Sequence, residues 1–229
     1  MLSAAELEII ALSLQVALFG LAASLPFAIA IAFLLARKDF PGKTLFDAAV
    51  HLPLVLPPVV VGYALLVLFG TQGPIGRLLE PLGIVLIFHW TGAALAAAIM
   101  GFPLMVRAIR LSIEAVDPRL EWAARTLGAG RWRVFFTVTL PLAASGVITG
   151  ALLAFARALG EFGATITFVS NIPGETRTLP LAIYTYTQVP GGDAQALRLS
   201  IFSVVLSLAA LAFSEWLARR RHPADARDA

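Results

Sequence analysis

The chain has 229 residues, of which 59% are hydrophobic and 14% are charged, and its mean hydropathy is +0.86. A soluble domain carries about 25% charged residues, so this composition excludes an ordinary soluble protein and indicates one that resides in lipid. The absence of cysteine excludes disulfides and thiolate metal sites, and the three histidines (His51, His89 and His222) lack metal-ligand spacing.

Five apolar runs are long enough to cross a bilayer, which takes about 20 residues per helix. We expect one transmembrane domain over residues 1–229, in which Glu6 and Glu8 precede a permanent first span instead of a cleavable signal peptide. The start of the third span is open, because the segment around Trp90 suits either a headgroup belt or the span itself. The expected spans are 9–36, 46–69, 84–108, 138–166 and 197–217.

The basic residues gather in three of the six regions outside these spans, which predicts the orientation of the chain. Positive residues stay on the cytoplasmic side, and the clusters predict an outside N-terminus and an inside C-terminus, with a short cytoplasmic tail at 219–229. This loop pattern indicates membrane topology and not nucleic-acid binding. The clustered residues are Arg37, Lys38 and Lys43; Arg107, Arg110, Arg119, Arg125, Arg131 and Arg133; and Arg219, Arg220, Arg221 and Arg227.

Prolines interrupt the second run. Pro53, Pro57 and Pro58 remove backbone donors, so we expect a bent or broken helix there, and Gly62 allows another helix to approach closely. Irregular backbone at membrane depth survives where protein or a water-filled cavity covers it. The segment is therefore either a broken helix that lines a translocation path or a kinked helix that serves only bundle packing.

The polar interval at 117–135 reads as two short helices joined by a turn. Asp117 can cap a helix whose first residue is Pro118. Gly128 fits the left-handed position that ends this helix, and the second helix starts at Arg131. Leu140 and Pro141 are expected to mark where the next span begins.

The first of these helices has a thin middle, because Ala123 and Ala124 stand there. Another protein's groove could close over it. The alternative is an amphipathic helix that lies on the lipid headgroups, held by its arginines and Trp122.

Arg157 and Glu161 are the charged residues well inside a predicted span, and their spacing stacks them on one helix face. They form either a self-neutralising ion pair or a polar site on a path for an anion. Gly160 and Gly163 would allow a bend beside them, and Thr165 could offer a hydroxyl. The row of Gly146, Gly150 and Ala154 favours close helix packing, within one subunit or across a dimer.

The 117–135 interval is similar to the EAA loop of ABC-importer permeases. That loop has the pattern Glu-Ala-Ala, three residues, Gly, nine residues, Ile, one residue and Leu-Pro. The positions that match it, with valine for isoleucine, are Ala123, Ala124, Gly128, Val138, Leu140 and Pro141. Trp122 occupies the glutamate position and Glu121 stands one residue earlier, so the loop leaves open whether Glu121 makes the family's acidic contact.

The segments 51–62, 155–165 and 171–180 also resemble molybdate-transporter permeases, to which sulfate and tungstate permeases are close relatives. The resemblance ranks molybdate first as the substrate, with tungstate and sulfate or thiosulfate as the alternatives. The resemblance implies an all-helical type I ABC-importer permease of the bacterial inner membrane. It also implies two copies of this chain, two copies of a cytoplasmic ATPase that binds ATP, and an external oxyanion-binding protein. The chain itself would hold no cofactor and no metal. The segment 175–180 either meets the binding protein or is a plain connector.

From the resemblance and the residues together we assign two sets of candidate site residues. The ATPase-coupling set is Glu121, Ala123, Ala124, Gly128, Arg131, Leu140 and Pro141. The translocation-path set is Pro57, Pro58, Gly62, Arg157, Gly160, Glu161, Gly163 and Thr165.

Enzymatic and gradient-driven alternatives fit the sequence less well. Gly42, Lys43 and Thr44 resemble the end of a phosphate-binding loop, but Arg37 stands where that motif needs glycine. A secondary transporter usually shows inverted repeats, and none is visible here. A membrane-embedded enzyme that uses Arg157 and Glu161 is a distant alternative.

Overall fold

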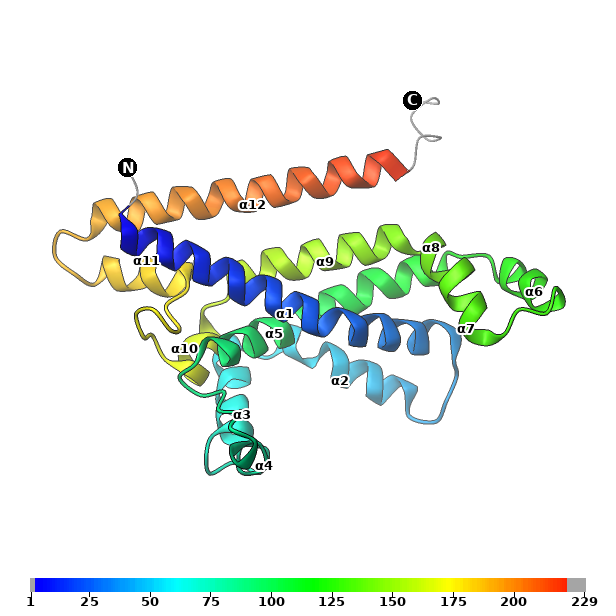
Figure 1. The fold of residues 1–229 in the computed structure, drawn as a ribbon, viewed down its shortest axis with the longest axis horizontal. Coiled ribbons are helices and arrows are strands. Elements are labelled where there is room, and N and C mark those ends of the chain that lie inside the picture. Colours follow the sequence, from blue (N-terminus) through cyan, green and yellow to red (C-terminus); the bar gives the residue numbers. More distant parts are fainter. Residues whose placement is uncertain (1–2, 222–229) are drawn as a thin grey trace.

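A computed structural model describes residues 3–221, and every regular element in that range is helical, as predicted (Figure 1). The predicted tail beyond residue 221 lies outside the described residues. In chain order the elements are α1 (Ala4–Arg37), α2 (Lys43–Val55), α3 (Pro58–Phe69), α4 (Gly76–Leu79), the 3₁₀ helix η1 (Glu80–Leu82), α5 (Trp90–Glu114), α6 (Pro118–Thr126), α7 (Arg131–Val134), the π-helix η2 (Phe135–Thr139), α8 (Leu140–Leu142), α9 (Ala144–Leu159), α10 (Gly163–Val169), α11 (Leu179–Thr187) and α12 (Asp193–Arg221).

Three helices are by themselves long and apolar enough to cross a membrane, namely α1, α5 and the part of α12 from Asp193 to Ala210. Two further candidates are pairs of helices that meet at a bend. Helices α2 and α3 meet at 113°, and the segment Arg131–Leu142 meets α9 at 68°. Counting each pair as one span gives up to five spans, while the exact number and the orientation stay predictions.

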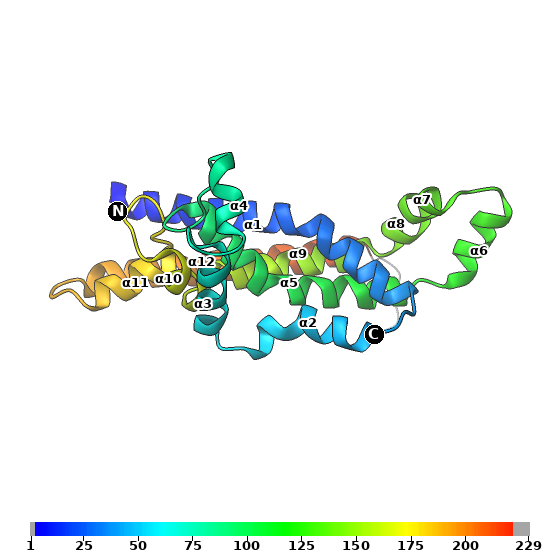
Figure 2. The ribbon, with the colours of Figure 1, turned by 90° about the horizontal axis from the view of Figure 1, so that it is seen from below.

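Helix α5 lies at the centre of the bundle, between α1 and α9 (Figures 1 and 2). In its apolar part 61% of the residues are buried, against 22% in α1 and 11% in α12. Small residues allow this packing, because in lipid helices associate through close contact of their backbones. A Cβ added at Gly20 of α1 would lie 2.7 Å from the carbonyl oxygen of Ala94. A Cβ added at Gly150 of α9 would lie 2.9 Å from the carbonyl oxygen of Met105.

The row of small residues on α9 faces α5 of the same chain. Gly146, Gly150 and Ala154 are all buried. A Cβ at Gly146 would lie 2.2 Å from the Cβ of Ser112, and a Cβ at Gly101 would lie 3.2 Å from Ala154. The row therefore serves packing within the subunit, which the sequence had left open.

The helix of the third predicted span, 84–108, lies further toward the C-terminus than the predicted bounds. It begins at Trp90, not near residue 84, and continues to Glu114. His89 is in an extended conformation and caps the helix by accepting a hydrogen bond from the Thr91 backbone N–H at 3.4 Å. Phe88 just before it has a φ of +59°, so the backbone of this approach is not helical.

The fourth predicted span, 138–166, is not one continuous helix. Leu140 and Pro141 do not begin it, because a helical segment already runs from Arg131 through them. Proline has no N–H and its ring crowds the carbonyl four residues earlier, so the turn before it widens. The Leu140 N–H bonds the carbonyl of Phe135 in the π pattern, and the chain bends into α9 at Ala143.

The two ends of the molecule are built from different parts of the chain. Helices α6 and α7 lie at one end of the long axis, and α10, α11 and the start of α1 lie near the other (Figures 1 and 2). Helices α3 and α4 project sideways from the bundle (Figure 1). Two breaks in the helices concern the path set: the first break lies between α2 and α3, and the second break lies between α9 and α10. The 117–135 loop is far from the second break.

Candidate coupling loop and translocation path

The start of α6 is capped as predicted. The Asp117 side chain accepts a hydrogen bond from the Arg119 backbone N–H at 2.9 Å. Pro118 occupies the first helical position, where the missing N–H costs nothing. The helix therefore begins at a defined residue.

The end of α6 is also fixed. Gly128 has a φ of +86°, its N–H bonds the Arg125 carbonyl at 2.9 Å, and the Ala129 N–H bonds the Ala124 carbonyl at 3.1 Å. These two bonds with a left-handed glycine form a Schellman motif. A short helix with both ends capped keeps its shape when it is pushed.

The loop exposes three large apolar side chains to solvent. Trp122 is 62% exposed, Leu127 is 89% exposed and Trp132 is 77% exposed. Ala123 between them is exposed as well, and Trp132 stacks on Phe136 with ring centroids 6.4 Å apart. Exposed apolar groups gathered in this way mark an interaction surface. Sequence reasoning missed Trp132, whose signal was an aromatic residue between two arginines.

Glu121 points in a different direction from its neighbour Trp122, because successive helical residues point about 100° apart. It is the buried residue of α6, with 6% exposure. Its Oε1 accepts hydrogen bonds from Arg37 Nε at 3.2 Å and from Thr139 Oγ1 at 2.9 Å, and Arg37 Nη2 lies 3.1 Å away. In this structure its carboxylate therefore faces its own chain. Sequence reasoning named Glu121 but missed Arg37 and Thr139.

At the second break, Arg157 pairs with Glu161, with 2.6 Å between Nη1 and Oε2. The two were expected to stack on one helix, but α9 ends at Leu159 and Glu161 lies in the break. The other carboxylate oxygen accepts a hydrogen bond from the Ala164 N–H at 2.8 Å. Glu161 thus caps α10 while it holds the end of α9, and its side chain is only 2% exposed.

The two predicted breaks contact each other. A Cβ added at Gly62 of α3 would lie 2.6 Å from the Ala164 carbonyl oxygen, and a Cβ added at Gly163 would lie 2.8 Å from the Pro58 Cβ. Helix α3, which follows Pro57, therefore packs directly on α10. This arrangement brings together most of the residues of the path set.

The remaining members of the path set differ in exposure. Gly160 is exposed, Arg157 has 28% of its side chain exposed, and Thr165 is 2% exposed. Thr165 is therefore enclosed by protein in this conformation, while Arg157 reaches the surface of the chain.

A second ionic cluster, which sequence reasoning missed, ties α2 to α5. Arg110 contacts Asp47 at 2.9 Å and Glu114 at 2.8 Å, and His51 Nδ1 lies 3.1 Å from an Asp47 oxygen. Together with Arg107 these residues line a cavity of about 310 Å³. The cluster fixes the half of the broken pair that precedes Pro57. The signal was the spacing of His51 from Asp47 and of Arg110 from Glu114, four residues in each case.

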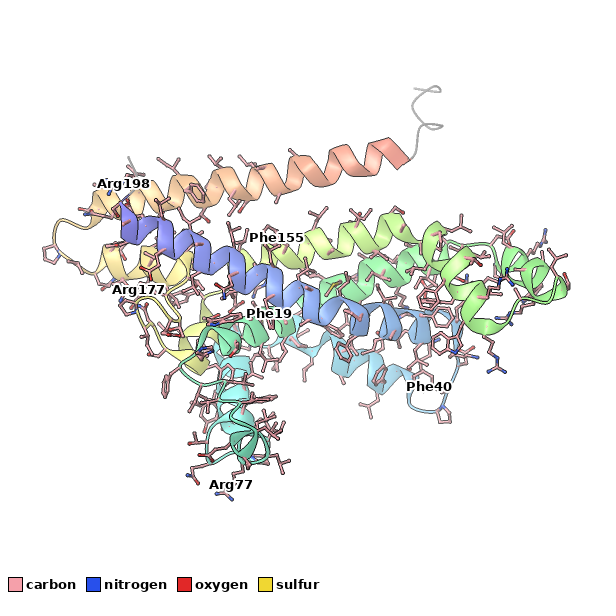
Figure 3. The ribbon with its side chains drawn as sticks, viewed as in Figure 1. Phe19, Phe40, Arg77, Phe155, Arg177 and Arg198 are labelled. Atoms are coloured by element: carbon pink, nitrogen blue, oxygen red, sulfur yellow. The ribbon has the colours of Figure 1, made fainter. Side chains whose placement is uncertain are left out.

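The segment at 171–178 is ordered by its own side chains. Arg177 Nε donates to Asn171 Oδ1 at 2.9 Å, and the buried hydroxyl of Thr176 accepts from the Ile172 N–H at 2.9 Å. Arg177 and Arg198 lie at the end of the molecule opposite the 117–135 loop (Figure 3). The segment at 171–178 therefore has a defined conformation.

Comparison with known proteins places this geometry in a family. The model of the binding-protein-dependent transport system inner membrane component matches residues 24–223. The molybdenum transport system permease protein ModB of Escherichia coli (strain K12) is 63% identical over 215 residues, which are 93% of this chain and 94% of that protein. The protein of the same name from Haemophilus influenzae is 57% identical over 94% of each chain.

A solved structure has the same fold. A bacterial ABC transporter involved in the import of the acidic polysaccharide alginate matches with a TM-score of 0.76 and 19% identity, over 96% of this chain and 80% of that chain. The chain belongs to the family of binding-protein-dependent transport system inner membrane components.

The bridge between α9 and α10 predicts a specific pattern of stability. Replacing Arg157→Ala leaves the Glu161 carboxylate buried without its partner, and breaking such a pair costs about 3 kcal/mol. Adding Glu161→Gln removes the charge but keeps an oxygen for the Ala164 N–H, so the double variant should recover most of the loss. Thermal unfolding of the detergent-solubilised chain measures both. A double variant as unstable as Arg157→Ala alone would contradict the pairing.

Proposed function

From this family membership we infer that the chain is the membrane-spanning permease subunit of an ATP-driven ABC importer of molybdate. The observation that carries the inference is the 63% identity to a molybdenum permease over 93% of this chain. The likeness covers 94% of that relative, so it extends over a whole permease and not over one motif. The residues alone left tungstate, sulfate and thiosulfate open, and the two molybdenum permeases rank molybdate first.

The family description implies an external binding protein, and the lack of a nucleotide motif in the sequence implies a separate ATPase. We propose a complex of two copies of this chain, two copies of a cytoplasmic ATPase and one binding protein in the bacterial inner membrane. ATP belongs on the ATPase. ATP binding draws the two ATPase subunits together and turns the permease outward, and hydrolysis returns it inward.

The 117–135 loop, from here the coupling loop, is the proposed contact with the ATPase. Its exposed apolar side chains, Trp122, Leu127 and Trp132, would enter a groove of the ATPase. Ala123 has a small side chain, so the walls of that groove could approach α6 closely. Trp122 then replaces an ion pair by apolar burial at the family's glutamate position. The caps at both ends of α6 keep it rigid, and Pro141 sets the bend behind it.

The two breaks are the proposed wall of the translocation path. Molybdate is a dianion, and a lone buried arginine would bind it too tightly for rapid release. Arg157 is partly exposed and its charge is balanced by Glu161, which suits weak, transient attraction. The packing of α3 on α10 would let both breaks move as one unit during the transport cycle.

The substrate is tested by reconstituting the chain with its cognate ATPase and binding protein in liposomes. We expect molybdate to stimulate ATP hydrolysis and to accumulate inside, and an equal concentration of sulfate to do neither. Stimulation by sulfate alone would reassign the substrate within the family. Uptake that persists without the ATPase and collapses with the ion gradient would overturn the ABC mechanism.

Gly128→Val tests the coupling role with a matched control. Nothing lies within 4 Å of a Cβ added at Gly128 or at Gly130, but only Gly128 has a positive φ. A left-handed conformation costs an L residue about 1–2 kcal/mol, more for a β-branched one, so Gly128→Val should lower binding-protein-stimulated ATPase activity about tenfold. Gly130→Val should leave it unchanged. Equal activity of the two variants would remove the coupling loop from the mechanism.

The path role of Arg157 is tested in the background that keeps the fold intact. Arg157→Ala with Glu161→Gln should assemble with the ATPase at normal yield, because no buried charge is left unpaired. Molybdate uptake should fall about tenfold, which is the size of effect typical of coupling between two sites of one protein. Normal uptake by this assembled complex would show that the pair only supports the fold.

A further inference from the structure

The coupling helix α6 is joined to the rest of its chain through a charged group. Glu121 is the buried residue of α6, and one oxygen of its carboxylate receives donors from two distant segments. Arg37, at the last turn of α1, supplies Nε and Nη2, and Thr139 of the π-helix η2 supplies its hydroxyl. Both donors are largely buried: Thr139 is 1% exposed and the Arg37 side chain is 16% exposed.

Arg37 also holds the segment that leads into α6. Its Nη2 donates to the carbonyl of Val116 at 2.9 Å, between the end of α5 and the cap of α6. One guanidinium thus bonds the backbone before α6 and a side chain within it. The planar fork of arginine makes such two-point contacts, whereas a lysine ammonium is a single point.

At its other end α1 is held by polar contacts of the same kind. Glu6 is fully buried and pairs with Arg198 of α12 at 2.8 Å. The Ser13 hydroxyl accepts a hydrogen bond from the Leu179 N–H at the start of α11 at 2.7 Å. As a whole, α1 is one helix of 34 residues with Pro26 inside it, about 51 Å long at 1.5 Å per residue.

We propose that Arg37 is a positioning residue for coupling. Through its pair with Glu121 it connects the movement of α6 to α1, and α1 carries that movement to the α11–α12 end of the molecule. The proposal rests on the coupling function of α6. In this proposal Glu121 contacts its own chain, and the ATPase contacts the exposed Trp122 on another side of the helix. The Thr139 hydroxyl connects the carboxylate of Glu121 to the π-helix η2.

The experiment uses the reconstituted complex and three variants: Arg37→Gln, Glu121→Gln and the two combined. Glutamine at position 121 still accepts the Thr139 hydrogen bond, so it removes the charge and little else. Arg37→Gln should keep the ATPase bound and keep basal hydrolysis, and in both single variants molybdate taken up per ATP should fall about tenfold. The double variant should be no worse than either single, because the two residues act as one unit.

Lys43→Gln is the matched control. It removes a cation at the start of α2, where Lys43 pairs with the exposed Asp39; among the described residues Lys43 makes no salt bridge or side-chain hydrogen bond with α6. Its uptake per ATP should equal that of the unmodified complex. Single variants within twofold of that value, or losses that add in the double variant, would overturn the proposal.

A second measurement separates this inference from the proposed function. Amide hydrogen exchange on the purified permease, with no partner and no substrate, should be faster in α6 for Arg37→Gln and Glu121→Gln but not for Lys43→Gln. Unchanged exchange in α6 would overturn the contact. Faster exchange with normal uptake per ATP would reduce it to an anchor and overturn the transmission role. If no oxyanion stimulates the unmodified complex, the proposed function fails while the exchange data still decide the contact.

Discussion

The fold depends on one constraint: backbone N–H and C=O groups in lipid must find partners within the protein. Continuous helices such as α1 and α5 meet it by themselves. The breaks at Pro57 and Gly160 do not, and each is tolerated because it is covered. Helix α3 packs against α10 with almost no space between them, and Glu161 supplies a side-chain acceptor for the freed Ala164 N–H. These two irregular segments therefore lie against each other, which is where a path for a polar substrate can be lined.

The same cost explains where the charges lie. Ionisable groups are expensive in a bundle like this one, and the buried carboxylates described here, with the partly exposed Asp47, each join two segments. Glu6 ties α1 to α12, Asp47 ties α2 to α5, Glu161 ties α9 to α10 and Glu121 ties α6 to α1. Apolar contacts fill the spaces between helices, while these pairs define how the pieces are fastened at their ends. A helix bundle whose pieces must shift without separating needs such discrete, geometrically specific attachments.

Local chemistry was predictable from the sequence, and contacts distant along the chain were not. The cap at Asp117, the left-handed Gly128 and the break at Pro57 each follow from the residue itself, and the structure has all three. The pairing of Arg37 with Glu121 spans 84 positions, so no periodicity could reveal it. The π turn was missed because Leu140 and Pro141 were interpreted as the start of a helix. Proline is tolerated in a first turn, but here the turn before it widened instead.

The position of Glu121 beside Trp122 shows how one short helix can serve two contacts at once. Neighbouring side chains on α6 point about 100° apart, so a residue pair can face inward and outward simultaneously. An apolar residue at position 121 would also pack, but it would tolerate rotation and sliding of α6. A carboxylate held by a guanidinium fork and a hydroxyl has one favourable geometry and becomes costly when displaced. The exposed Trp122 can then adapt to a partner, while the buried Glu121 holds α6 in one orientation relative to α1. A buried charge that fixes the helix to its own chain, beside an exposed aromatic ring that is free for a partner, is the arrangement that the proposed coupling role of α6 requires.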